Sequence, residues 1–157
     1  MKKSKDKKVC IVSSSGGHLY KTYCLQDWWK KYPRFWVVRN DKFTSDILSE
    51  ENKYYAFFPE NRNIINSIKN LFLAFKILNI EKPTLVFSMG AGIAPPFFIA
   101  ARILNIKSVF IETFSYIPKA TLSGKIIYFI CNHFYVQNKK LLKIYPRAKY
   151  IGSILPI

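Results

Sequence analysis

Short β-rich runs alternate with helix-sized segments along the chain, and this alternation constrains the fold more than any other feature. The β-rich runs are residues 8–13, 35–38, 54–58, 84–87, 108–111 and 133–136, with a further edge strand expected at 150–151. Helices are expected at residues 19–31, 44–51, 63–80, 122–131 and 139–144, with one more that has Pro95 and Pro96 in its first turn. Strands joined through helices form βαβ units with right-handed crossovers. The sequence therefore predicts an α/β fold with a doubly wound, mostly parallel, Rossmann-like sheet.

The length and composition indicate a basic arm at residues 1–8 followed by a single Rossmann-like domain at 9–157. The chain has 157 residues, 50% of them hydrophobic, which excludes a disordered basic tail. No apolar run reaches the roughly 18 residues of a spanning helix, and the N-terminus lacks the apolar centre of a signal peptide. Three widely spaced cysteines fit neither a disulfide framework nor a zinc site. We expect a cytoplasmic protein without a metal or another cofactor.

The charge is the unusual part of the composition. The chain carries 25 Lys and Arg against 9 Asp and Glu, a formal net charge of +16. A packed domain this basic is expected to meet an anionic partner: nucleic acid, phosphate groups or a lipid surface. The basic residues are spread over the arm, the long helix and the C-terminal third, and no RNA- or DNA-recognition motif is visible. Nucleic acid is therefore the less favoured partner.

Two glycine loops follow predicted strands at the edge where open α/β sheets bind ligands. The first, Ser13-Ser-Ser-Gly-Gly-His18, matches neither a Walker loop nor the dinucleotide fingerprint. Its glycines allow a tight turn in front of a helix that favours phosphate, and His18 adds a titratable group there. The second is Ser88-Met-Gly-Ala-Gly92. Each loop has a plain structural alternative, a strand-to-helix turn without a ligand.

Glu112 ends the fifth predicted strand and is the only acidic residue from Lys82 to the C-terminus, among ten Lys and Arg. A lone carboxylate at the ligand edge of a buried strand favours a role in binding hydroxyls or in organising the adjacent loop. The alternative is an incidental surface charge.

The long helix at 63–80 combines cations with surplus apolar side chains. Arg62, Lys69 and Lys76 recur every seven residues and so form one stripe. The residues expected to face the sheet instead are Ile64, Ile68, Leu71, Phe75 and Leu78. Leu73 and Ile77 project near the stripe, where a solvated face would be polar. Arg62, Lys69, Leu73, Lys76 and Ile77 are therefore a candidate membrane face, with a solvated face or a protein contact as alternatives.

Several segments together resemble a known family. They are Val12-Ser-Ser-Ser-Gly-Gly-His-Leu19, Phe87-Ser-Met-Gly-Ala-Gly92 with Ala94-Pro-Pro-Phe97, Val109-Phe-Ile-Glu-Thr-Phe114, Thr121-Leu-Ser-Gly-Lys125 and Phe134-Tyr-Val-Gln137. In this order and spacing the chain resembles the bacterial PssD/CpsF-type polysaccharide biosynthesis proteins. Those are similar to the membrane-recruiting, non-catalytic subunit of the split GlcNAc transferase that extends dolichol-diphosphate-GlcNAc in eukaryotes. The resemblance covers nearly the whole chain after the basic arm.

The resemblance implies half of a GT-B enzyme of the MurG-like group, whose N-terminal half takes a lipid-diphosphate-sugar. Residues 9–157 would then be the acceptor-binding half, and a catalytic partner chain would hold a UDP-sugar. By position, the residues at the acceptor diphosphate would be Ser15, Gly16, Gly17, His18, Gly90 and Gly92. His18 and Glu112 would be the candidate catalytic residues. Ser115 and Tyr116 replace the Asp-Arg often found in the bacterial relatives, which removes a cation near the expected cleft.

These expectations combine into one hypothesis and two rivals. The chain is expected to bind and activate a polyprenyl-diphosphate-sugar acceptor for a catalytic glycosyltransferase subunit, in capsular or exopolysaccharide synthesis. It is expected to lie peripherally on an anionic membrane surface, at the inner face of the cell membrane. The rivals are a self-sufficient small nucleotide-sugar enzyme and a basic nucleic-acid-binding domain.

Overall fold

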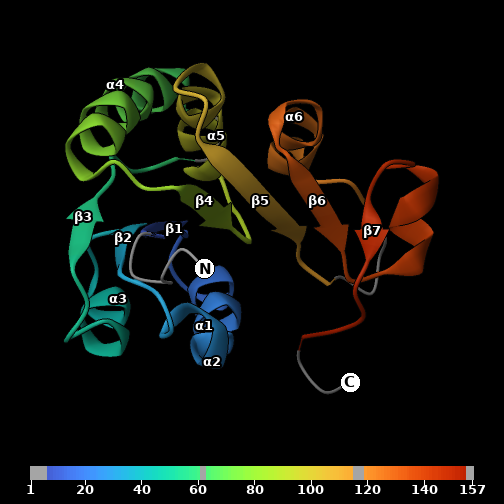
Figure 1. The fold of residues 1–157 in the computed structure, drawn as a ribbon, viewed down its shortest axis with the longest axis horizontal. Helices are drawn as coiled ribbons and strands as arrows, with labels where there is room; N and C mark the ends of the chain where they lie inside the picture. Colours follow the sequence, from blue (N-terminus) through green and yellow to red (C-terminus); the bar gives the residue numbers. More distant parts are fainter. Residues whose placement is uncertain (1–6, 61–62, 115–118, 155–157) are drawn as a thin grey trace.

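Seven parallel strands form one twisted sheet in a computed structural model of the chain, which describes residues 7–60, 63–114 and 119–154 (Figure 1). The strand order is β3-β2-β1-β4-β5-β6-β7. The strands are β1 (Val9–Val12), β2 (Arg34–Val38), β3 (Lys53–Tyr55), β4 (Leu85–Ser88), β5 (Lys107–Glu112), β6 (His133–Val136) and β7 (Lys149–Tyr150). This arrangement confirms the predicted α/β, doubly wound sheet, and it places the switch in strand order between β1 and β4.

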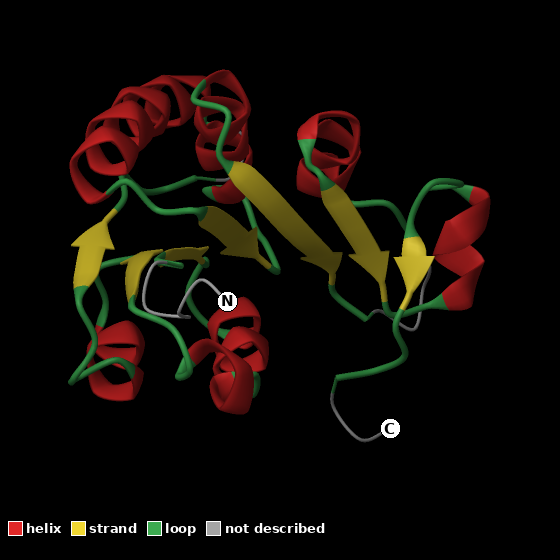
Figure 2. Ribbon diagram, in the orientation of Figure 1, coloured by secondary structure: helices red, strands yellow, loops and turns green. Residues whose placement is uncertain are grey.

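Helices cover the sheet in two layers (Figure 2). On one face lie α4 (Ile64–Glu81), α5 (Ala94–Ile103) and α6 (Leu122–Ile130); on the other lie α1 (Gly17–Tyr23), α2 (Gln26–Trp29) and α3 (Lys42–Ile47). The 3₁₀ helix η2 (Lys139–Lys143) precedes β7. Each face of the sheet buries its own apolar cluster, the first around Phe97, Phe98 and Phe110 and the second around Trp29 and Trp36.

Three predicted helices differ from the structure, and the strand expected at 54–58 is the shorter β3. The helix expected at 19–31 is divided into α1 and α2, and the Trp29 indole N–H donates to the carbonyl oxygen of Thr22 across the break. The helix expected at 44–51 is α3, which begins earlier because the Asp41 side chain accepts a hydrogen bond from the Thr44 N–H. The helix expected at 139–144 is the 3₁₀ helix η2.

The buried side of α4 was predicted correctly only in part: Leu71, Phe75 and Leu78 pack in or against the core as expected. Ile77 is 2% exposed and packs in the core, so it lies on no exposed membrane face, while Leu73 is half-buried against the core. Ile64 and Ile68, expected against the sheet, are 76% and 51% exposed. The reason is Asn70, a polar residue on the buried stripe, which bonds the backbone N–H and carbonyl of Phe57 through its side chain.

The cations of the predicted membrane face are exposed where the structure describes them. Lys69 and Lys76 are exposed on α4, whereas Arg62 lies outside the described residues. Of the basic arm only Lys7 and Lys8 are described, and Lys8 forms an ion pair with Glu81 at the end of α4. Among the residues that the structure describes, no helix has the length and apolar character needed to span a bilayer.

Candidate functional site

The two glycine loops predicted from the sequence lie side by side at the carboxyl ends of β1 and β4. The Ser14 N–H donates to the Gly90 carbonyl oxygen at 3.2 Å, and the Ala91 N–H donates to the Ser14 hydroxyl at 3.1 Å. Neighbouring parallel strands in the centre of the sheet bring the loops together, because β1 pairs directly with β4. The structure therefore brings these predicted residues into one site.

The first loop keeps one side open. Gly16 has a φ of 76°, in the left-handed region that favours glycine, and a Cβ at Gly16 or Gly17 would meet nothing within 4 Å. The Ser15 hydroxyl and the Thr44 N–H hydrogen-bond to Asp41; although burial acts to raise the pKa of that carboxyl, these bonds lower it below its usual value. Asp41 thus ties the loop to the start of α3, while the glycine side remains accessible.

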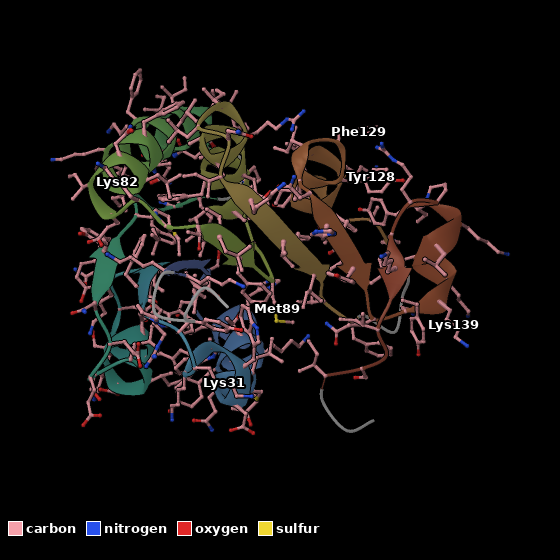
Figure 3. All side chains as sticks on the ribbon, in the orientation of Figure 1. Lys31, Lys82, Met89, Tyr128, Phe129 and Lys139 are labelled. Atoms are coloured by element: carbon pink, nitrogen blue, oxygen red, sulfur yellow. The ribbon has the colours of Figure 1, made fainter. Side chains whose placement is uncertain are left out.

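His18 lies over the second loop. Its Nδ1 is 3.0 Å from the carbonyl oxygen of Met89, the residue labelled at the end of β4 in Figure 3. A Cβ on Gly90 would come within 2.9 Å of the imidazole ring, and Gly90 has a φ of 111°. Both facts require glycine there. Since a carbonyl can only accept, Nδ1 carries the proton and Nε2 holds the lone pair.

The protonation state of His18 allows its side chain to accept a proton. Burial lowers the pKa of His18 below its usual value, and the Lys21 charge lowers it further, against the opposing effects of the Met89 carbonyl and Glu60. The imidazole is therefore neutral at pH 7, with a free lone pair. A neutral histidine with a fixed tautomer is the form that a general base requires.

Lys21 is a site residue that the sequence analysis missed. Its Nζ donates to the Phe114 carbonyl oxygen at 3.4 Å, so it reaches from α1 to the end of β5. Its place three residues after His18 on the same helix was the available signal, because side chains at that spacing share a face. It brings a cation beside the glycine loop.

Glu112 lies on the opposite face of the sheet from His18. Ile111 belongs to the cluster beneath α1 and α2, so Glu112, the next residue along the strand, points toward α6. Glu112 is 3% exposed, and its carboxyl group accepts from the Thr121 hydroxyl at 3.0 and 3.1 Å and from the Tyr145 hydroxyl at 3.4 Å. The structure does not bring the two predicted catalytic residues together.

The surroundings of Glu112 explain its raised pKa. Burial raises the pKa of this carboxyl from 4.5 to about 7, and the Thr121 and Tyr145 hydrogen bonds only partly oppose the shift. A Cβ on Gly124 would be 1.8 Å from Oε2, so the carboxyl group occupies the space of a missing side chain on α6. That glycine, in the first turn of α6, was the sequence signal for this packing.

A groove of about 690 Å³ opens beside the second loop, between the N-terminal parts of α4, α5 and α6. Its volume is within the roughly 300–1,000 Å³ that small-molecule sites have. Its lining is mainly apolar and includes Ile64, Ile68, Leu71, Pro95, Pro96, Ile99, Leu122 and Ile126. Gly92, predicted at a diphosphate, lines this groove, whereas Gly90 lies against His18.

The prolines decide what the groove can bind. Pro95 and Pro96 have no N–H group, and the Ala94 N–H already donates to the Ala91 carbonyl oxygen. The first turn of α5 therefore offers the groove no hydrogen-bond donor and suits hydrocarbon rather than phosphate. The second loop links this groove to the polar site, since Gly90 lies against His18 and Ala91 and Gly92 line the groove. Among the described residues, no three His, Cys, Asp or Glu side chains are grouped to hold a metal ion.

The names of the relatives refer to UDP-N-acetylglucosamine transferases or to a subunit of one. The human UDP-N-acetylglucosamine transferase subunit ALG14 is 25% identical over 94% of this chain and 82% of its own length. The Staphylococcus haemolyticus UDP-N-acetylglucosamine–N-acetylmuramyl-(pentapeptide) pyrophosphoryl-undecaprenol N-acetylglucosamine transferase is 30% identical over 69% of this chain and 30% of its own length.

Solved structures share the fold. MurG of Acinetobacter baumannii matches 96% of this chain with a TM-score of 0.73 and 15% identity, and a Rickettsia bellii UDP-N-acetylglucosamine 2-epimerase matches 94% with a TM-score of 0.76 and 14% identity. The chain spans about half the length of each, 47% and 45%. Residues 9–154 match the family model described as "Oligosaccharide biosynthesis protein Alg14 like". This chain belongs to the Alg14-like family of oligosaccharide biosynthesis proteins.

Proposed function

We propose that this chain is the acceptor-binding subunit of a two-chain UDP-sugar glycosyltransferase whose acceptor is a polyprenyl-diphosphate-linked sugar. The observation that carries the proposal is the apolar groove that opens beside the polar loop of His18. A ligand that fills both parts must join a hydrocarbon chain to an anionic, hydroxyl-bearing head. A lipid-diphosphate-sugar has this chemistry, and the chain's net charge of +16 favours it.

Within this proposal each part of the site has a chemical task. The open side of Gly16 and Gly17 and the Lys21 ammonium group receive the diphosphate, and the groove receives the first part of the polyprenyl chain. Nε2 of His18 accepts the proton from the acceptor hydroxyl as its oxygen bonds to C1 of the donor sugar and the UDP leaves. Gly90 holds the imidazole in place, and Glu112 does not touch the substrate.

The partner supplies the donor site. The human relative is named a subunit of its transferase, which supports a second chain that completes the cleft. The ALG14 relative is named a subunit of a UDP-N-acetylglucosamine transferase, which favours UDP-N-acetylglucosamine as the donor. Capsular or exopolysaccharide synthesis stays a prediction from the sequence, since the ALG14 and MurG names do not refer to it.

The function is tested by reconstitution with the product of the neighbouring gene, where the catalytic chain is expected. We expect transfer of N-acetylglucosamine to a polyprenyl-diphosphate-sugar only when both chains are present. Full activity of the neighbouring chain alone, unchanged on adding this chain, would overturn the proposal. Binding of UDP-N-acetylglucosamine by this chain alone, followed by transfer, would instead establish the self-sufficient enzyme.

The layer of α4, α5 and α6 is the face proposed to lie on the membrane. Apolar side chains on its outer side are exposed, among them Phe129, which projects from α6 (Figure 3). The others are Ile65, Phe72, Ile80 and Ile103, and the groove residues Ile64, Ile68, Leu122 and Ile126 are exposed as well. The exposed Lys69 and Lys76 accompany them. Mixed apolar and cationic faces bind anionic bilayers peripherally, which supports a place on the inner face of the cell membrane.

Vesicle flotation tests this face. Ile65→Asp with Phe72→Asp is expected to lower binding to vesicles containing anionic phosphatidylglycerol at least tenfold, because two apolar side chains that enter the interface become charged. Phe43→Asp is the matched control, since Phe43 is 42% exposed on α3 in the opposite layer. Equal flotation of the double variant and the wild type would remove the membrane assignment.

A further inference from the structure

Glu112 is a buried acid without a cationic partner. None of the described lysines or arginines forms an ion pair with it, and the titratable side chain that meets it is Tyr145, beyond η2. From α6 it meets Thr121 and the glycine at 124, and after β6 the Gln137 side chain donates to its backbone carbonyl. The pKa of Tyr145 is raised, first by burial and then by Glu112, so Tyr145 stays protonated.

The carboxyl group of Glu112 is the acceptor at the end of a chain of hydrogen bonds from α6. The Gly124 N–H donates to the Thr121 hydroxyl oxygen, and the Thr121 hydroxyl donates to the carboxyl oxygen of Glu112. The Tyr145 hydroxyl also donates to the carboxyl group, to Oε2 at 3.4 Å. An ionised carboxylate at 3% exposure would keep two hydrogen bonds but lose its hydration without a counter-charge.

Thr121 links this set of bonds to the groove. It is the N-cap of α6, and Thr121, Leu122 and Ser123 line one wall of the groove. The carboxyl group of Glu112 therefore holds the first turn of α6 to β5. It can do so only while it is buried away from water. Moving that turn outward would let water reach Glu112.

We propose that Glu112 is a positioning residue: its protonated carboxyl group fastens the start of α6 to β5, and loss of the proton loosens this wall of the acceptor groove. The inference rests on the proposed function for the identity of the groove's ligand, but not for the proton-linked movement of α6. Protonation would thereby regulate how readily the groove opens.

Amide hydrogen exchange in the free full-length chain tests the movement. With intrinsic rates divided out, protection of the Gly124 and Lys125 amides is expected to fall about 20-fold between pH 5.5 and 7.5, because the closed state binds the proton more tightly than the open state. The Leu104 amide, bonded within α5 to the Ala100 carbonyl, is the internal reference.

Glu112→Gln should abolish this pH dependence, since the amide copies the neutral acid. Glu50→Gln, on an exposed carboxylate, should leave it unchanged. Thr121→Val should speed exchange at every pH, and Thr121→Ser should restore protection. Protection that is flat with pH in the wild type, or equally pH-dependent in Glu112→Gln, would overturn the proposal.

Binding of farnesyl diphosphate, measured separately, tests the proposed function. If farnesyl diphosphate does not bind, the proposed function is overturned, but the result of the hydrogen-exchange experiment is unaffected.

Discussion

Replacement of His18 by asparagine is expected to lower sugar transfer by the reconstituted two-chain enzyme by about 100-fold or more, because removing a positioned general base costs roughly 10²–10⁴ in rate. The amide of asparagine can keep the hydrogen bond to the Met89 carbonyl oxygen, which Nδ1 makes at 3.0 Å, but it offers no basic lone pair in place of Nε2. The loss should appear in kcat, with KM for the acceptor nearly unchanged.

A second variant separates proton transfer from diphosphate binding. Lys21→Met removes the cation beside His18 and should raise KM for the acceptor while leaving most of kcat. The assay measures initial rates against acceptor concentration at saturating donor. Wild-type kcat in His18→Asn would exclude His18 as the base.

The stability of the wild type is expected to fall by about 2 to 3 kcal/mol relative to Glu112→Gln as the pH rises from 5 to 8. The pKa of Glu112 is about 7 in the folded chain and 4.5 without the fold, so the folded state binds this proton more tightly. The stabilisation is complete below about pH 4.5 and is lost as the pH rises through about 7.

Denaturant titrations at several pH values measure this difference. His18 titrates in the opposite direction, because burial lowers its pKa, but its contribution is the same in both proteins and cancels in the comparison. Glu50→Gln again serves as the control for the changed charge and should follow the wild type. Parallel curves for the wild type and Glu112→Gln would show that the buried carboxyl group is ionised at little cost.

The strand pattern was predictable, and so was the meeting of the two glycine loops. Strands that are apolar on both faces, such as Val9–Val12, have few alternatives to the middle of a parallel sheet, and all four of these residues are buried. Their loops must then emerge at one edge. The family resemblance expected from those loops was confirmed by the Alg14-like match over residues 9–154.

The side-chain arrangement was less predictable, for reasons visible at particular residues. Asn70 is polar yet buried, so a pattern that counts apolar positions alone misjudges which side of α4 faces the sheet. Glu112, at the end of β5, and His18, at the start of α1, lie at the same edge of the sheet but on opposite faces. Which face Glu112 takes depends on whether odd or even residues of the strand point to that face. The groove requires three helix ends to converge, a tertiary contact that no local pattern contains.

The two prolines at the start of α5 have a thermodynamic consequence. Water inside a groove is held by polar groups, and this helix end presents none because Pro95 and Pro96 lack N–H groups and Ala94 has used its own. Water in this part of the groove is therefore weakly held and is displaced at little enthalpic cost. A hydrocarbon chain entering there should be recognised calorimetrically by a negative heat-capacity change, whatever the sign of its enthalpy.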